Sequence, residues 1–254
     1  MRYARMKTSL RGFWRSLTSR EPAELPSNPG YCPCCRKDTV FREHGTWLRD
    51  QYLCDNCHSI PRQRHLMMVM DQYYPQWGEL DIHESSPSNP LIAQFCGKYT
   101  YSQFFPDEER GTTFQGTRCE DIEQLTFPDA SFDIFVTQDV LEHVFHPGRA
   151  LREIHRVLKP GGAHIFTAPK HRGLAKTICR AELDDTGEVR YLLEAQYHGN
   201  PVGDGKALVT WDYGDDFGQL ASEWAGAEMV TSHIRDRAFG IDAEFNEVFI
   251  IRKA

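Results

Sequence analysis

Residues 132–167, FDIFVTQDVLEHVFHPGRALREIHRVLKPGGAHIFT, decide the fold of this chain. The first six residues, 132–137, form an apolar run that is typical of a buried strand, and residues 163–167 form a second one. Between them, residues 147–158 predict a helix, because four apolar side chains fall on one face: Ala150, Leu151, Ile154 and Leu158. Pro160 and two glycines then end this helix. The stretch therefore predicts a strand, a helix and a second strand parallel to the first.

The same alternation continues on both sides of this unit. Toward the N-terminus the sequence predicts three further strands, at residues 80–83, 99–103 and 117–120. It also predicts one helix, at residues 89–96. Toward the C-terminus it predicts a helix and an antiparallel pair of strands, at residues 216–224, 229–234 and 247–252. The fold class is therefore α/β, with a parallel sheet covered on both faces and ligands bound beyond the carboxyl ends of its strands.

Three blocks carry a resemblance to a known family: Asp121–Asp133, Gln138–His143 and Leu158–Gly162. In their order and spacing they resemble the class I S-adenosylmethionine-dependent methyltransferases, and within them the broad group that methylates small molecules, lipids and RNA. The resemblance implies a Rossmann-like, seven-stranded methyltransferase sheet over residues 61–254. It also implies S-adenosylmethionine as the cofactor.

The first strand departs from the family's pattern. The family ends this strand with an acidic residue and a glycine-rich turn, whereas this chain has no glycine there and five candidate cofactor residues instead: Asp81, His83, Glu84, Ser85 and Ser86. Asp81 takes the acidic position, and the serines are small side chains that can add hydroxyl hydrogen bonds. We expect the following helix to supply free backbone N–H groups.

The resemblance implies further cofactor residues at the ends of the next strands. Gln103 stands where the family has an acid that binds the ribose, and Phe104 can pack on the adenine. Asp121 corresponds to the acid that accepts from the adenine amino group, with the Ile122 backbone reading the ring. Gln138 and Asp139, which directly follow the strand of residues 132–137, are the last expected cofactor residues and are expected beneath the methionine portion of the cofactor.

The acceptor side is expected at residues 170–212, an insertion longer than a simple crossover and rich in functional groups. Methyl transfer to many acceptors requires removal of a proton. His171 and His198 are the candidate bases in this cover. His143, which begins the helix after the buried strand, is a third candidate, although a packing or capping role is the alternative.

Two Cys-x-x-Cys pairs lie near the N-terminus, Cys32 with Cys35 and Cys54 with Cys57. Paired knuckles of this kind complete a four-sulfur zinc cage without an open position, so we expect a structural zinc ribbon at residues 28–60. Cys34, His58 and His65 are alternative ligands. The alternative to a zinc site is that the cysteines form a redox pair or are simply buried thiols. Residues 39–42 and 46–48 predict short strands in the ribbon, and residues 62–74 predict a helix that joins it to the core.

Charge is unevenly distributed along the 254 residues. Residues 1–70 hold 12 Lys and Arg against 6 Asp and Glu, whereas the rest holds 17 against 30. Residues 1–27 are expected to be a basic, flexible segment. The chain has no apolar run of the roughly 18 residues that a transmembrane helix needs, and no secretory signal, so a cytoplasmic location is expected.

Three functions remain open from the sequence. The first is methyl transfer to a small-molecule or saccharide-type acceptor. The second is an RNA methyltransferase in which the basic ribbon contacts phosphates, through Arg36, Lys37, Arg42, Arg49, Arg62 and Arg64. The third is a non-catalytic binding module, which the missing glycines favour. The acidic charge of the core opposes the second, and the retained family blocks oppose the third.

Overall fold

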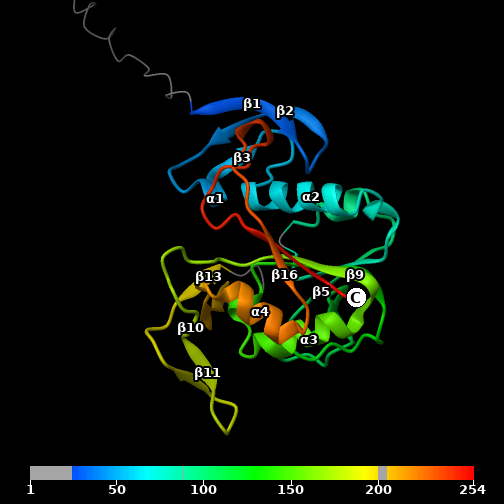
Figure 1. The fold of residues 1–254 in the computed structure, drawn as a ribbon, viewed down its shortest axis with the longest axis vertical. Coiled ribbons are helices and arrows are strands. Elements are labelled where there is room, and N and C mark those ends of the chain that lie inside the picture. Colours follow the sequence, from blue (N-terminus) through cyan, green and yellow to red (C-terminus); the bar gives the residue numbers. More distant parts are fainter. Residues whose placement is uncertain (1–24, 88, 200–204) are drawn as a thin grey trace, which may run out of the picture.

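The computed structural model describes residues 25–87, 89–199 and 205–254. The basic segment expected at residues 1–27 lies outside this part of the chain, except for its last three residues. The described chain forms layers (Figure 1): a small N-terminal sheet, a helix beneath it, a central sheet, two further helices on its other face, and a group of hairpins at one side.

The central sheet has eight strands in the order β16-β17-β9-β8-β4-β5-β7-β6. Five of them are parallel: β4 (Ile82–Ser85), β5 (Tyr99–Gln103), β7 (Thr117–Cys119), β8 (Phe132–Gln138) and β9 (Leu158–Thr167). β17 (Val248–Arg252) runs antiparallel to β9 and to β16 (Met229–Ser232), as the sequence predicted. These seven strands confirm the expected sheet, and β6 (Thr113–Phe114) adds a short hairpin edge.

The N-terminal sheet is antiparallel and consists of β1 (Ser27–Cys32), β2 (Lys37–Glu43) and β3 (Tyr52–Cys54). The strand expected at residues 46–48 is wrong, because residue 48 already belongs to the one-turn helix α1 (Leu48–Gln51). β2 confirms the other short strand. Gly30 is needed in β1, since a Cβ there would collide with the carbonyl of Ala238.

Helix α2 (Pro61–Tyr73) joins this ribbon to the sheet and confirms the helix expected at residues 62–74. Proline at the first helical position suits its missing N–H group. Its Leu66, Met67 and Met70 are buried in one cluster with the sheet residues Ile82 and Ile165 and with the ribbon. The ribbon and the sheet therefore share one continuous core, as Figure 1 shows by the position of α2 between them.

The opposite face of the sheet is covered by α3 (Pro147–Val157) and α4 (Phe217–Ala225), both at the predicted places. Leu151 and Ile154 of α3 pack there with Phe135 and Phe166 of the sheet, and α4 contributes Phe217. Most of these side chains are below 3% exposed, which is the arrangement that an apolar helix stripe favours.

The helix expected at residues 89–96 is wrong. Only a single 3-10 turn, η2 (Ile92–Gln94), forms between β4 and β5. Among the described residues between β4 and β5, no α-helix follows β4. Of the other three 3-10 turns in the described chain, η1 (Trp77–Glu79) lies in the loop before β4, η3 (Leu141–His143) follows β8, and η4 (Arg237–Phe239) lies between β16 and β17.

The segment between β9 and α4 forms three small antiparallel pairs instead of a crossover. They pair β10 (Ile178–Cys179) with β15 (Trp211–Asp212), β11 (Ala181–Leu183) with β12 (Val189–Tyr191), and β13 (Tyr197–Gly199) with β14 (Lys206–Leu208). Every helix among the described residues is too short or too polar to cross a lipid bilayer.

Candidate functional site

The carboxyl ends of β4, β5, β7 and β8 meet at one edge of the sheet, which we call the carboxyl edge. Ser85, Gln103 and Gln138 end three of these strands, and Asp121 follows the fourth by two residues. The parallel pairing of Ser85 with Ser102 and with Thr137 brings these ends together. The structure therefore collects most of the expected cofactor residues at the edge where open α/β sheets bind ligands.

The turn after β4 takes a backbone shape that usually needs glycine. Ser86 has a φ of 56°, in the left-handed region, and its N–H donates to the Ser102 carbonyl at 2.8 Å. A serine thus keeps the tight turn that the family makes with glycine, at a cost in backbone strain. At the end of β5, Phe104 is 48% exposed and free to lie against a bound ring.

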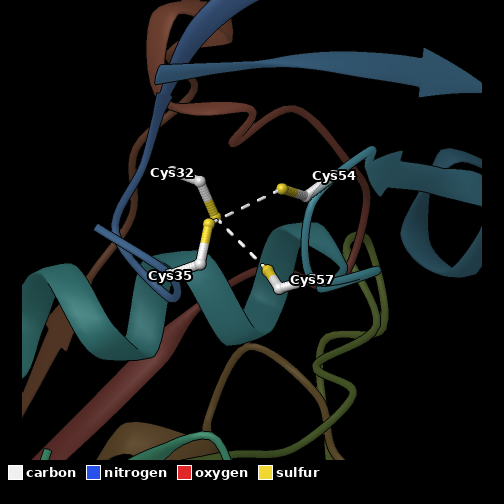
Figure 2. A group of neighbouring side chains, drawn as sticks. All are labelled: Cys32, Cys35, Cys54 and Cys57. Atoms are coloured by element: carbon white, nitrogen blue, oxygen red, sulfur yellow. Dashed lines mark hydrogen bonds between the residues drawn. The ribbon is translucent and has the colours of Figure 1, made fainter. Parts of the chain in front are cut away.

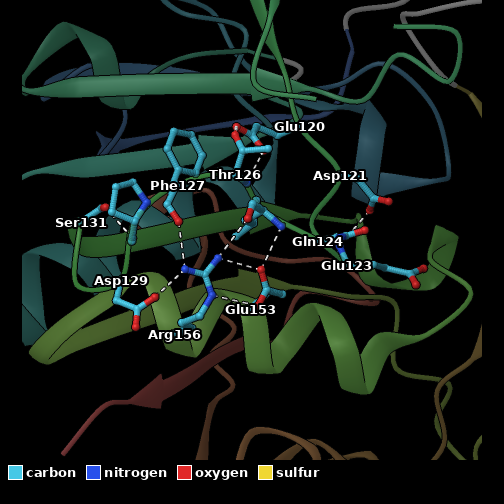
Figure 3. Close-up of polar contacts among 12 residues, drawn as sticks. Glu120, Asp121, Glu123, Gln124, Thr126, Phe127, Asp129, Ser131, Glu153 and Arg156 are labelled. Carbon is cyan, nitrogen blue, oxygen red and sulfur yellow. Dashed lines mark hydrogen bonds and ion pairs between the residues drawn. The ribbon is translucent and has the colours of Figure 1, made fainter. Parts of the chain in front are cut away.

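The loop that carries Asp121 is held in place by helix α3. Arg156 donates to the carbonyls of Leu125 and Phe127 at 3.0 and 2.9 Å, and Glu153 accepts from the Leu125 N–H at 3.0 Å. Figure 3 shows Arg156 at the centre of this network, with Asp129 as a further partner. The family block is therefore a folded loop whose shape is fixed by one arginine and one glutamate.

Asp121 itself is only partly engaged. Its Oδ1 accepts from the Glu123 N–H at 2.8 Å, while burial raises the pKa of the carboxyl. Ile122, next to it, is 4% exposed. One carboxylate oxygen that bonds within its own turn orients the side chain, and the other is left for a donor such as an exocyclic amine.

Glu84 and Gln138 form a buried polar pair beneath this edge. Gln138 donates to Glu84 Oε1 at 2.7 Å, and the Tyr99 hydroxyl donates to Oε2 at 2.7 Å. Burial raises the pKa of Glu84 to about 7. The Gln138 Oε1 atom is buried and has no hydrogen-bond partner among the described residues. An orphaned acceptor at this position suits a bound ligand that carries donors, so the edge fits the family's cofactor.

Two expected cofactor residues lie elsewhere. Asp81 precedes β4 and sits at the opposite, amino edge of the sheet, where Lys159 donates to it at 2.5 Å and to Asp133 at 3.0 Å. Its placement is therefore a correction: β4 starts and ends two residues later than expected, which leaves Glu84 as the acid near the carboxyl edge. His83 is fully buried against Phe132, and both its ring nitrogens bond to hydroxyls.

Asp139 is occupied by two arginines of the N-terminal region. Arg49 of α1 lies 2.5 Å and Arg62 of α2 3.1 Å from its Oδ2, and Thr167 donates to Oδ1 at 2.9 Å. Burial opposes ionisation here, but the two guanidiniums overcome it and hold the pKa of Asp139 below its ordinary value. The sequence did not indicate that the ribbon side of the chain reaches the carboxyl edge.

Two of the three candidate bases meet beside this edge. The rings of His143 and His198 are 5.1 Å apart and perpendicular, and both approach Glu142, at 3.8 and 3.9 Å from its Oε1. Burial lowers the pKa of both histidines. Glu142 was not among the expected site residues, although its position next to His143 in a family block was the available signal. His171 lies apart from this group, 3.6 Å from Asp212.

The four expected zinc ligands come together in the ribbon. The sulfurs of Cys32, Cys35, Cys54 and Cys57 all lie within 4.8 Å of one another, and Figure 2 shows them turned toward one point. Both knuckles have the same shape: the residue after each pair has a left-handed φ, 55° at Arg36 and 56° at His58. Tetrahedral Zn–S bonds of about 2.3 Å place sulfurs roughly 3.8 Å apart, close to the 3.7 Å between Cys32 and Cys57.

The alternative ligands are placed outside this group. Cys34 is fully buried, and the group of four does not include it. The ring nitrogens of His65 bond to the Asn246 carbonyl and the Ser232 hydroxyl at 2.5 and 2.9 Å. The geometry thus selects the four cysteines with regular spacing as the set that can hold a metal.

Most of the basic residues proposed for phosphate contact are already paired. Arg36 pairs with Asp71 and Arg42 with Asp55, at 3.4 and 2.9 Å, while Arg64 is fully buried and donates to the Gly240 carbonyl. With Arg49 and Arg62 held by Asp139, only Lys37 of the six has no partner among the described residues.

The comparisons with known proteins concern the central sheet. A profile of the methyltransferase domain family matches residues 96–166, from before β5 to the end of β9. The ubiquinone/menaquinone biosynthesis C-methyltransferase of Pseudoalteromonas translucida is 33% identical over 87 residues, 29% of this chain and 35% of that protein. The dimethylglycine N-methyltransferase of Parasynechococcus marenigrum is 43% identical over 47 residues, 18% of this chain and 17% of that protein.

Among solved structures, an S-adenosylmethionine-dependent methyltransferase from Mesorhizobium loti aligns with 74% of this chain and 98% of its own, at 15% identity and a TM-score of 0.48. The sequence matches span about a third of the first curated relative and less of the second. The family match identifies residues 96–166 as part of a methyltransferase domain, which includes β5, β7, β8 and most of β9. S-adenosylmethionine is the cofactor of the family that this part of the sequence resembles.

Proposed function

We propose that this protein transfers a methyl group from S-adenosylmethionine to a small-molecule or saccharide-type acceptor. The observation that carries the proposal is the carboxyl edge, where Gln103, Asp121 and Gln138 converge on the matched methyltransferase domain. A half-engaged carboxylate and an orphaned amide oxygen at this edge are features that the hydrogen-bond donors of a bound cofactor would satisfy.

The cofactor, when bound, supplies an electrophilic methyl on a sulfonium sulfur. In this proposal Asp121 accepts from the adenine amino group, the Ile122 backbone reads the ring, and Gln103 bonds the ribose hydroxyls. Phe104 covers the adenine. Gln138 and the turn at 85–86 face the methionine portion, with Glu84 behind Gln138 to fix its amide.

The acceptor approaches from the insertion. With the cofactor bound, the acceptor's lone pair would take up the methyl carbon, and the electron pair of the carbon–sulfur bond would return to sulfur. The acceptor proton goes to a neighbouring base, for which His198 and His171 are the candidates and His143 the third. Trp47 and Tyr197 remain 43% and 49% exposed nearby, and flat apolar faces beside hydrogen-bonding groups suit a small polar molecule.

RNA is the weaker acceptor class in this proposal. Phosphate binding needs free cations, and the ribbon's arginines are instead paired with carboxylates or buried. The acidic balance of residues 71–254 also repels a polyanion.

The ribbon is proposed to hold one structural zinc through Cys32, Cys35, Cys54 and Cys57. A four-sulfur set leaves no open position, so the metal takes no part in the reaction. Its role is to fix α1 and the start of α2, which carry the two arginines on Asp139. A cytoplasmic location is part of this proposal, because clustered cysteines suit metal binding in a reducing compartment.

Calorimetric titration with S-adenosylhomocysteine tests the cofactor site. The wild type should bind, and Asp121→Ala should bind several-fold to tenfold more weakly, because one hydrogen bond is worth about 1 kcal/mol. Asp81→Asn is the matched control at the amino edge and should bind like the wild type. Absence of binding by the wild type at millimolar ligand would overturn the enzyme proposal in favour of the binding module.

A further inference from the structure

The side chains of Glu142, His143 and His198 converge beside the carboxyl edge, outside the cofactor residues described above. One carboxylate oxygen of Glu142 and one ring nitrogen of each histidine all lie within 4.8 Å of one another. Nothing in the cofactor site explains this group. We propose that it is a binding site for a divalent metal ion, separate from the zinc of the ribbon.

The carboxylate of Glu142 is the strongest reason for a cation. Its side chain is fully buried, and neither oxygen has a hydrogen-bond partner in the described part of the chain. An isolated carboxylate in such a place is costly, and buried charges are found paired or bound to metals. The nearby Arg49 and Arg62 favour its charge only in part, because both form ion pairs with Asp139 and neither donates a hydrogen bond to Glu142.

His143 presents a lone pair to this carboxylate. His143 Nδ1 lies 2.8 Å from the Leu208 carbonyl, an acceptor, so this nitrogen carries the proton. Nε2 of the same ring is then unprotonated and lies 3.8 Å from Glu142 Oε1. An imidazole that donates its far N–H to a carbonyl is the usual arrangement around a metal-ligating histidine.

The distances suit a bridging ion better than direct hydrogen bonds. His143 Nε2 and His198 Nδ1 lie 3.8 and 3.9 Å from the carboxylate oxygen, too long for hydrogen bonding. Metal–ligand bonds of about 2.1 Å at a tetrahedral angle separate donor atoms by roughly 3.4 Å, so movements of about 0.5 Å would complete the site.

The backbone that presents these ligands is fixed. The turn η3 (Leu141–His143) is tied to the insertion by Thr210, whose N–H and hydroxyl both donate to the Glu142 carbonyl at 2.8 and 2.9 Å. The Tyr213 hydroxyl donates to the Leu141 carbonyl at 2.6 Å. His198 comes from β13, which pairs with β14 next to the same contacts.

Two imidazoles and one carboxylate make a mixed donor set that favours first-row divalent ions and leaves coordination positions open. His198 is about two-fifths exposed on its side chain, so the open side faces the acceptor approach. Resting on the proposed methyl transfer, the substrate class narrows to acceptors with a hydroxyl or other oxygen donor, whose proton a bound cation makes easier to remove. Of the three candidate bases, His171 then takes the proton, because the metal occupies the lone pairs of His143 and His198.

The test uses the full chain with its zinc retained. Mn²⁺ is the probe, because it is a hard ion that competes poorly for thiolates, and electron paramagnetic resonance reports its free concentration. The wild type should bind one Mn²⁺ per chain, and Glu142→Gln and His198→Asn should each weaken binding by on the order of 100-fold. His146→Asn is the matched control, since this histidine pairs with Glu123 outside the group and should leave binding unchanged.

Co²⁺ is the second probe, read by its visible spectrum. The inference is overturned if neither ion binds the wild type at millimolar concentration, or if Glu142→Gln binds as tightly as the wild type. S-adenosylhomocysteine titration of the same samples separates the two proposals. Cofactor binding without cation binding removes only the metal site, and it also confirms that the variants are folded.

Discussion

The two edges of the central sheet differ in how many of their polar atoms have hydrogen-bond partners. At the amino edge, Lys159 bridges Asp81 and Asp133, and Lys253 donates to the Leu158 carbonyl at 2.7 Å. At the carboxyl edge and in the segments that cover it, buried polar atoms lack hydrogen-bond partners in Arg49, Arg62, Gln138, Glu142, Arg180, Asn246 and Glu247. Only Tyr74, His155 and His164 share this property elsewhere in the described chain.

This difference in hydrogen bonding also distinguishes two of the blocks that resemble the family. Gly162 packs so that a Cβ there would lie 2.7 Å from the Asp133 carbonyl oxygen, and the Lys159 ammonium closes the same corner. The Leu158–Gly162 block is therefore structural. The Gln138–His143 block, equally typical of the family, contains two residues with buried polar atoms that lack hydrogen-bond partners, Gln138 and Glu142. We expect such unsatisfied atoms, more than membership of a family block, to indicate which residues bind ligands.

Loss of the ribbon metal should disturb one edge and spare the other. Structural zinc in such knuckles contributes about 10 kcal/mol or more of binding free energy, so the largest effect is expected here. Elemental analysis should find one zinc per chain. Cys54→Ser should abolish it and speed amide hydrogen exchange in residues 28–60 and 138–143, because the arginines on Asp139 lose their support.

Cys34→Ala is the matched control and should retain the zinc, since this buried thiol lies outside the group of four. Exchange near Asp81 and Lys159 should stay slow in every variant. A protein without stoichiometric zinc, or a Cys54→Ser variant that keeps it, contradicts the ribbon proposal.

Breaking one ion pair at each edge compares them directly. Asp139→Asn leaves two largely buried guanidiniums with only the half-exposed Asp50 as a carboxylate partner and should lower the free energy of unfolding by about 3 kcal/mol. Lys159→Met removes a bridge whose side chains are about a third exposed, so it should cost about 1 kcal/mol or less. Urea unfolding measures both, and equal losses would mean that the edges do not differ.

Glu84 should give the carboxyl edge a pH dependence. Its pKa is raised by burial from 4.5 to about 7, so it is protonated in both states at low pH and ionises first in the unfolded chain as pH rises. The free energy of unfolding of the wild type should therefore fall between about pH 4.5 and 7, by about 3 kcal/mol relative to Glu84→Gln, and then level off. A constant difference between the two proteins from pH 4 to 8 would show that Glu84 ionises normally.

The sequence predicted what depends on local pattern. The strand of 99–103, the helices at 62–74 and 147–158, and the cysteine pairs all follow from spacing along the chain, and the structure has them within a residue or two. The helix expected at 89–96 does not form. Its prediction rested on one proline that suits a first helical turn and gave too little weight to the shortness of the segment. The strand at 80–83 was placed two residues early, which moved the acidic role from Glu84 to Asp81.

The rest depends on contacts between distant segments. Arg49 meets Asp139 across 90 residues, and His198 meets Glu142 across an insertion whose hairpins have no strong periodicity. No spacing rule along the chain connects these residues. The sequence named His143 and His198 as separate candidates, but only the fold shows that they face one buried carboxylate.

Gln103 gives the smallest predicted effect and tests the carboxyl edge at its least regular point. Its side chain, at the end of β5, has no hydrogen-bond partner among residues that the structure describes, although its carbonyl accepts from the Glu120 N–H at 3.1 Å. If the ribose lies here, Gln103→Ala should weaken S-adenosylhomocysteine binding by a few-fold, which corresponds to about 1 kcal/mol. Gln103→Glu should preserve or improve affinity, because a carboxylate makes stronger, charge-assisted bonds to hydroxyls. Calorimetry of both variants decides the matter: a Gln103→Glu protein that binds more weakly than Gln103→Ala would place the ribose away from this strand end.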